Sequence, residues 1–190
     1  MNSVVEKTSF TAEEFLTMPG QHQFELVDGE LLERNVSMLS GWVGGEIFCL
    51  ISEYSRVHEL GWVFPCEVGI QCFPDRPRTV RKPNAFFVKG SRLGWDEIAD
   101  GWLKIVPDLI VEVISPQDLS DEVEEKIEMF HKVGVPLIWV VSLAARNVRI
   151  LRSNGSIALV REGGLLSGED ILPGLSIPVS SIFPKKPPTV

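Results

Sequence analysis

A strand–helix–strand unit in the second half of the chain limits the possible folds most. It consists of the apolar run PDLIVEVI at 107–114, an amphipathic segment from Leu119 to Lys132, and a second apolar run, VPLIWVV, at 135–141. Gly134 follows the amphipathic segment as a typical helix-ending residue, and fully apolar strands are typical of a sheet interior. Because strands are also expected on both sides of this unit, the order of elements predicts an α/β (α+β) fold with a mixed sheet.

The other expected elements precede and follow this unit. Thr11 is a candidate N-cap for a short helix, and FELVDGELLER predicts a hairpin around the Asp28-Gly29 turn. Apolar residues recur at helical spacing from about Leu39 to Glu59, which predicts a long amphipathic helix. Strands are also expected in GWVFPCEVGIQCF, in TVRKPNAFFV and in a hairpin around Asn154-Gly155, and the chain then packs a last apolar turn.

Composition limits the class of protein. Of the 190 residues, 44% are hydrophobic and 23% are charged, so we expect one domain, with a core at about 10–183 and a C-terminal tail at 184–190. No run resembles a membrane span or a signal peptide, which predicts a cytoplasmic protein with no membrane partner. Three cysteines without metal-binding spacing predict reduced, mostly buried thiols. A net charge of -8 argues against a protein that coats nucleic acid by bulk attraction.

A single carboxylate interrupts the first apolar strand of the unit. Alternate residues of a strand share a face, so Glu112 is expected beside Ile110 and Ile114, buried or nearly so. A buried carboxylate without a partner is costly, and a cation, a metal or hydrogen-bond donors should therefore lie next to it. Lys126 falls inside the apolar stripe of the following helix and is expected to reach Glu112.

Asn84 is the third member of this expected pocket. In VRKPNAFFV the even positions from Val80 to Val88 are expected on one face, which places a polar amide among apolar neighbours. Two interpretations stay open. In the first, carboxylates from two adjacent strands hold Mg²⁺, and a lysine positions or polarises the water that attacks a phosphodiester. In the second, Glu112 and Lys126 form a buried salt bridge that attaches the helix to the sheet.

The ordered motifs of the chain resemble one known family. FELVDGEL, VRKPNAFFV, PDLIVEVISPQD, EVEEKIEMFHKVGVPLIWVV and ILPGLSI together resemble the Uma-two family of restriction-endonuclease-like proteins, from about Phe10 to Phe183. The resemblance implies a PD-(D/E)XK nuclease-like fold, in which helices flank a mixed sheet. It also implies Mg²⁺ or Mn²⁺ as cofactor, DNA as substrate, and a homodimer that cuts two strands with two subunits.

The site residues of that family fall on the residues singled out above. Its strand aspartate falls at Asn84, its strand glutamate at Glu112, and its lysine, displaced onto the next helix, at Lys126. Ile114 stands at the usual lysine position, and Ser142 replaces an aspartate that is usual after the last strand of the unit. An amide oxygen can coordinate Mg²⁺ but carries no charge, so the resemblance implies a nuclease that is weakened at Asn84.

Other charged residues are second-tier candidates. Glu46 lies at the edge of the long helix's apolar stripe and is either an extra acid near the metal or a surface charge. Asp108 shares the face of Glu112, although about 13 Å of strand separates them. Glu25 and Glu30 flank the hairpin turn and are interpreted as structural or rim residues. Four cations directly before Asn84 form either a DNA-phosphate contact or a solvated loop, namely Arg76, Arg78, Arg81 and Lys82.

Three functions are consistent with these features. The first is a metal-dependent DNA nuclease. The second is a nuclease-fold protein without catalysis that binds nucleic acid or a partner, which the amide at Asn84 favours. The third is a structural oligomer that binds no nucleic acid, which the acidic net charge favours.

Overall fold

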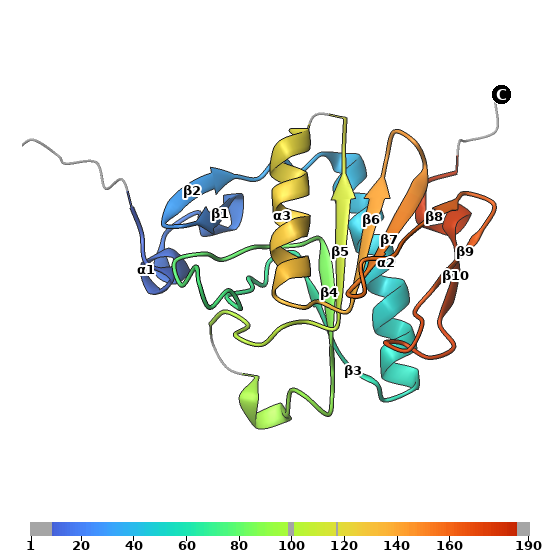
Figure 1. The fold of residues 1–190 in the computed structure, drawn as a ribbon, viewed down its shortest axis with the longest axis horizontal. Helices are drawn as coiled ribbons and strands as arrows, with labels where there is room; N and C mark the ends of the chain where they lie inside the picture. Colours follow the sequence, from blue (N-terminus) through green and yellow to red (C-terminus); the bar gives the residue numbers. More distant parts are fainter. Residues whose placement is uncertain (1–8, 99–100, 117, 186–190) are drawn as a thin grey trace, which may run out of the picture.

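The computed structural model describes residues 9–98, 101–116 and 118–185, and a six-stranded sheet forms its centre (Figure 1). The strand order is β3-β4-β5-β6-β7-β8. Neighbouring strands are antiparallel except for β5 and β6, which are parallel. The strand bounds are β3 Gly61–Pro65, β4 Ala85–Lys89, β5 Leu109–Ile114, β6 Leu137–Ser142, β7 Asn147–Arg152 and β8 Ile157–Arg161. The mixed sheet predicted from the order of elements is confirmed.

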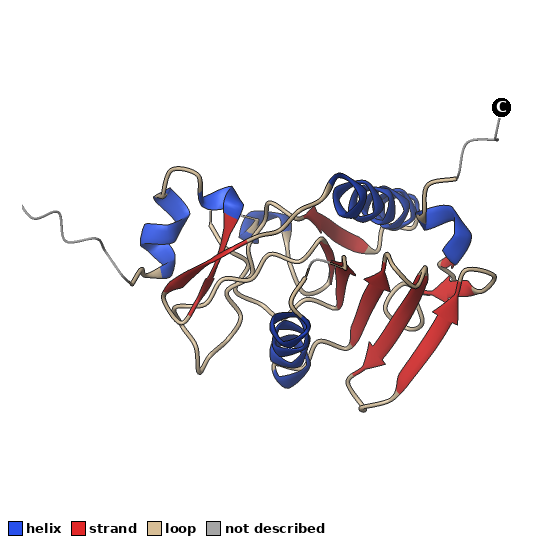
Figure 2. Cartoon of the chain, turned by 90° about the horizontal axis from the view of Figure 1, so that it is seen from above, coloured by secondary structure: helices blue, strands red, loops and turns tan. Residues whose placement is uncertain are grey.

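Two long helices cover opposite faces of this sheet (Figure 2). They are α2, Met38–Val57, and α3, Ser120–Lys132. The odd-numbered residues of β5, among them Val111, pack in one cluster with Ile47 of α2. Ile110 packs in the other cluster with Phe130 of α3. The face of β5 on which Glu112 was expected is therefore the α3 face of the sheet.

A small unit, formed by the N-terminal part of the chain, lies beside the sheet (Figures 1 and 2). It contains α1, Ala12–Thr17, the short helix η1, Gln21–Gln23, and the hairpin of β1, Phe24–Val27, with β2, Glu30–Glu33. The predicted cap and turn are confirmed: Thr11 caps α1, and Asp28 and Gly29 have φ values of 51° and 94°. Leu26 exchanges two backbone hydrogen bonds with Val80, which fastens the hairpin to the segment before β4.

The C-terminal part adds a strand pair that the sequence did not predict. β9, Leu165–Ser167, pairs with β10, Ser176–Pro178, where we had expected a single apolar turn. Two short helices complete the described chain, η2 Trp95–Glu97 and η3 Val179–Ile182. Residues 186–190 of the expected tail lie outside the described residues. None of the helices in the described part of the chain is long and apolar enough to cross a membrane.

The predicted strand TVRKPNAFFV is wrong over its first half. β4 begins only at Ala85, after Pro83 and a bend at Asn84. Proline has no N–H with which to continue a ladder, so the residues before it do not alternate in register with β4. Val80, Lys82 and Asn84 consequently face three different surroundings and do not share the face of the later residues of β4. GWVFPCEVGIQCF likewise forms a strand only as far as Pro65.

Candidate active site

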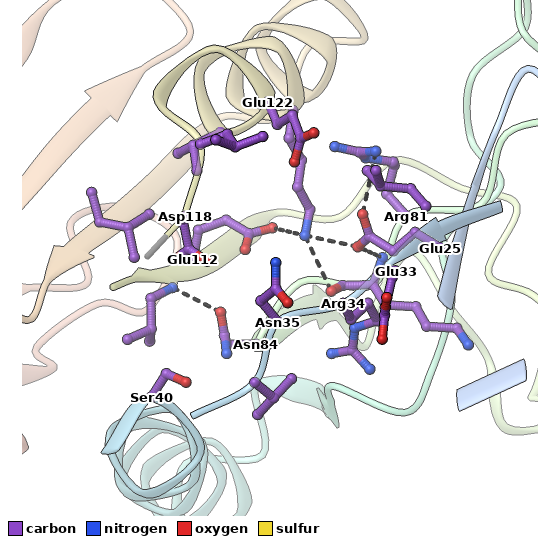
Figure 3. A pocket seen from close by; sticks show the side chains of 18 residues that line it. Glu25, Glu33, Arg34, Asn35, Ser40, Arg81, Asn84, Glu112, Asp118 and Glu122 are labelled. Atoms are coloured by element: carbon purple, nitrogen blue, oxygen red, sulfur yellow. Dashed lines mark hydrogen bonds and ion pairs between the residues drawn. The ribbon is translucent and has the colours of Figure 1, made fainter. Parts of the chain in front are cut away.

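A pocket opens beside the C-terminal half of β5, between α3, the segment before β4 and the loop after β2 (Figure 3). Asn84, Glu112 and Lys126 all line it, although they lie far apart in the sequence. Four further acids line the same pocket, namely Glu25, Glu33, Asp118 and Glu122. The fold thus brings the three residues that were singled out by sequence to one place, among additional charged groups.

Lys126 is the centre of an ionic cluster in this pocket. Its ammonium lies 2.7 Å from Glu112 Oε1 and 2.8 Å from Glu25 Oε1, and it donates to the backbone carbonyl of Lys82 at 3.2 Å. These three acceptors match the three donors of an ammonium group. The expected contact between helix and strand is confirmed, and the side chain of Lys126 is only 14% exposed.

Glu25, for which the sequence leaves a structural and a rim position open, is a member of this cluster. It is buried, its Oε1 accepts from the Lys82 backbone N–H at 2.5 Å, and its Oε2 lies 3.3 Å from the Arg81 guanidinium. Alternation along β1 predicts opposite exposure for Glu25 and Leu26, but both are buried, because the hairpin packs against the main sheet unit as well as on itself. The signal that could have identified Glu25 was its place in the FELVDGEL motif.

The two carboxylates differ in their electrostatic surroundings. Burial raises the pKa of Glu112 above its ordinary value, and the Lys126 ammonium offsets only part of this effect. Burial acts in the same direction on Glu25, but Lys126 and Arg81 together outweigh it, so the pKa of Glu25 is lowered. Glu25 is therefore the more firmly ionised of the two. Apart from the ammonium of Lys126, no described donor reaches Glu112 Oε1.

Asn84 occupies the position between β5 and α2. Its Oδ1 accepts a hydrogen bond from the Val113 backbone N–H at 2.7 Å, beyond the last residue pair of β4 and β5. Its side chain packs against Gly44, where an added Cβ would lie 3.2 Å from Asn84 Cβ. An amide oxygen has two lone pairs, and the bond from Val113 uses one of them.

Two of the second-tier acids, Asp108 and Glu46, do not line this pocket. Asp108 stands before β5, at the end of the strand away from Glu112, where it accepts from the Lys89 backbone N–H and pairs with Arg92, both at 2.9 Å. Glu46 is half-buried on α2. The structure therefore gives Asp108 a role in fixing the start of β5, and it leaves Glu46 outside the pocket.

The four cations before Asn84 do not form a shared basic surface, which corrects the predicted phosphate contact for two of them. Lys82 is 1% exposed, and its ammonium donates to the backbone carbonyl and side chain of Gln21, over the rings of Phe15 and Trp102. Arg81 is buried against Glu25.

Arg81 and Lys82 point inward because the chain pairs with the hairpin at Val80, which turns their side chains towards α1 and β1. Arg76 is partly exposed and pairs with Asp28 and Glu125. Arg78 donates to Ser9 Oγ at 2.9 Å. Of the four cations, only Arg76 and Arg78 are at least partly exposed in the structure.

The family to which the chain belongs follows from its sequence over most of this fold. Residues 12–180 match the Uma2 family, which is described as "Putative restriction endonuclease". The chain belongs to the Uma2 family. The fold class and family expected from the ordered motifs are confirmed.

A solved structure shares the fold of this Uma2 chain. It is the crystal structure of a "putative nuclease belonging to DUF820" from Anabaena variabilis ATCC 29413, with a TM-score of 0.77 and 17% sequence identity. The similarity covers 92% of this chain and 97% of that one. At this identity the likeness concerns the fold alone. No match was found among the curated proteins.

Membership of the Uma2 family implies a possible divalent metal, and the residues of the pocket allow the fit to be tested. Among the residues that the structure describes, no group of three His, Cys, Asp or Glu side chains could hold a metal ion. Glu112 and Asn84 nevertheless bring a carboxylate and an amide oxygen to the same pocket. Mg²⁺ often binds through one or two protein ligands and completes its shell with water and phosphate. The pair therefore fits a weak, water-rich magnesium site and not a closed protein cage.

Proposed function

We propose that this protein is a divalent-metal-dependent nuclease that hydrolyses phosphodiester bonds of DNA, with an activity weakened by Asn84. The observation that carries the proposal is the pairing of Lys126 with Glu112 at 2.7 Å in a pocket that also contains Asn84. A carboxylate, a neighbouring oxygen ligand and a lysine are the groups that metal-assisted hydrolysis requires. Membership of the Uma2 family supports the same reaction class.

Each residue has a distinct role in this proposal. Glu112 and Asn84 would hold Mg²⁺ or Mn²⁺, which when bound offsets negative charge on the phosphate and lowers the pKa of a bound water. Lys126 orients the attacking water and carries positive charge next to the phosphate oxygens. Asn84 supplies an oxygen without a charge, so it holds the metal less tightly than a carboxylate at the same place would.

Cleavage of supercoiled plasmid DNA tests this function. We expect slow nicking by the wild type in Mg²⁺ or Mn²⁺, and none after chelation of the metal. Glu112→Gln and Lys126→Gln should each abolish it. Glu46→Gln is the matched control, because this acid lies on α2 outside the pocket and its loss should leave nicking unchanged. Nicking that persists in Glu112→Gln would contradict the proposal.

One observation favours a second function, binding of nucleic acid without catalysis. The buried cluster contains two carboxylates, Glu25 and Glu112, and two cations, Arg81 and Lys126, so their charges balance without a metal. A balanced cluster of this kind can serve packing alone. Retention of DNA at low salt in the presence of chelator, by a protein that never nicks DNA, would identify this function.

We further propose that the protein acts on DNA as a homodimer. Two copies related by a two-fold axis would present two pockets to the two strands of a duplex. Sedimentation at several protein concentrations tests this arrangement. A strictly monomeric mass at high concentration would exclude it.

A further inference from the structure

Glu25 reaches the pocket from outside the central sheet and α3, the elements that carry Glu112 and Lys126. It lies on β1 of the N-terminal hairpin, which forms a sheet of its own with β2. Figure 3 shows its carboxylate between Arg81 and the lysine that bridges to Glu112. A buried carboxylate that was needed only to fasten the hairpin would be satisfied by Arg81 and the Lys82 backbone N–H, yet Glu25 also lies 2.8 Å from the Lys126 ammonium.

The two carboxylates beside Lys126 are held very differently. Glu25 has three partners, which are the Arg81 guanidinium, the Lys82 backbone N–H and the Lys126 ammonium. Glu112 Oε1 has the ammonium alone among the described donors. Glu112 can therefore exchange its cation at the cost of one contact, whereas Glu25 would have to leave a network.

A cation that binds Glu112 must compete with Lys126 for the same carboxylate. Two positive charges on one buried oxygen repel each other, so the ammonium would tend to leave the pocket unless another anion holds it. Glu25 is that anion, and its distance to the ammonium equals that of Glu112 to within 0.1 Å, since the two are 2.8 Å and 2.7 Å.

We infer that Glu25 is a positioning residue, which holds the Lys126 ammonium in the pocket when Glu112 binds a divalent cation. The inference rests on the proposed function for the identity of that cation. Arg81 and the Lys82 backbone N–H in turn hold Glu25. The N-terminal hairpin thus completes a site whose other parts come from the central sheet and α3.

Selective acetylation of lysines, read by mass spectrometry on the metal-free protein, tests this division of roles. Lys132 is the internal reference, because it lies on the same helix and its side chain is 72% exposed. We expect Lys126 to stay protected relative to Lys132 in Glu112→Gln, as in the wild type. We expect Glu25→Gln to raise its labelling about tenfold, since the ammonium then loses the one carboxylate that Arg81 and the Lys82 backbone N–H hold in place. Glu30→Gln, on the same hairpin and exposed, is the matched control and should change nothing.

The labelling has two outcomes that overturn the inference. One is exposure of Lys126 in Glu112→Gln to the same extent as in Glu25→Gln, and the other is continued protection in Glu25→Gln. Circular dichroism establishes that each variant is folded. If Glu25→Gln does not fold, Glu25→Asp replaces it, because it keeps a charge next to Arg81 but withdraws the carboxylate from Lys126. Unchanged labelling in Glu25→Asp overturns the inference. If neither variant folds, labelling of Lys126 in Glu112→Gln that approaches that of Lys132 overturns it.

Calorimetric titration with Mn²⁺ separates a positioning residue from a metal ligand. We expect Glu25→Gln to bind Mn²⁺ within about twofold of the wild-type affinity, because Glu25 is not a ligand, and Glu112→Gln to lose binding. A loss of affinity in Glu25→Gln comparable to that in Glu112→Gln would overturn the positioning role. If the wild type itself binds no Mn²⁺, the proposed function fails, whereas the metal-free labelling still reports whether Glu25 holds Lys126.

Discussion

Replacement of Lys126 by methionine is expected to destabilise the protein strongly. Methionine keeps the length of the side chain but removes the ammonium that lies 2.7 Å from Glu112 and 2.8 Å from Glu25. Both carboxylates are buried, so Lys126→Met leaves two negative charges facing each other, and Arg81 is then the remaining cation beside Glu25. Breaking a buried ion pair from one side costs about 3–5 kcal/mol.

The loss of folding stability in Lys126→Met has an expected size and an expected pH dependence. For a chain of this length, about 3–5 kcal/mol corresponds to a fall in Tm of roughly 6–20 °C. In the wild type the pKa of Glu25 lies below its ordinary value of 4.5, so this carboxylate stabilises the fold above that pH and loses its effect as the pH falls. Without Lys126, desolvation raises the pKa of both carboxyls in the fold. The stability gap between wild type and variant should therefore be largest near neutral pH and close as the pH falls through about 4.5.

Urea denaturation followed by circular dichroism between pH 4 and pH 8 measures this gap. Lys132→Met is the matched control on the same helix, since Lys132 is exposed and pairs with an exposed Glu128. Its loss should change stability by no more than about 0.5 kcal/mol. The reasoning is refuted if Lys126→Met costs no more than Lys132→Met, or if its cost is the same at both ends of the pH range.

Three further predictions concern neighbouring residues. Asn84→Asp should tighten Mn²⁺ binding and raise plasmid nicking above the wild-type level, because it adds the missing negative charge to the pocket. Unchanged binding and nicking would mean that the pocket has no catalytic function. Gly44→Ala should weaken Mn²⁺ binding, since the added Cβ would lie 3.2 Å from Asn84 Cβ and displace that side chain. Gly45→Ala is the control, because its added Cβ would have nothing within 4 Å. It should stabilise the helix by about 1 kcal/mol and leave Mn²⁺ binding unchanged. Burial lowers the pKa of Lys82 from 10.5 to about 8, so the free energy of unfolding of the wild type should increase as the pH rises from about 8 to 10.5. Thermal melts of Lys82→Met should not show this increase.

The central part of the fold could be predicted because its signals are local. The apolar runs that became β5 and β6, and the stripe of α3 between them, have the periodicity of the elements that they form. The contact between Glu112 and Lys126 followed from the same periodicity, because a buried acid and a lysine inside an apolar stripe both need a partner on the shared face.

The other parts of the fold and of the candidate site depend on tertiary contacts that cannot be seen in the sequence. Lys82 looked like part of a basic loop, but its chain segment pairs with β1 at Val80 and turns the ammonium inward. The sequence of the hairpin leaves open whether Glu25 is a structural or a rim residue, and its burial is decided by the docking of the hairpin on the segment before β4. The pair β9 and β10 is three residues long in each strand, too short to give a period-2 pattern.

Calorimetric titration of the wild type and Glu112→Gln with Mn²⁺ tests most directly whether this pocket is a metal-dependent nuclease site. Glu112 is the carboxylate with one replaceable partner, in the pocket that also contains Asn84. Saturable binding by the wild type, lost in Glu112→Gln while that variant stays folded, is the predicted result. Absence of binding by the wild type, or equal binding by the two proteins, would contradict a metal site at Glu112.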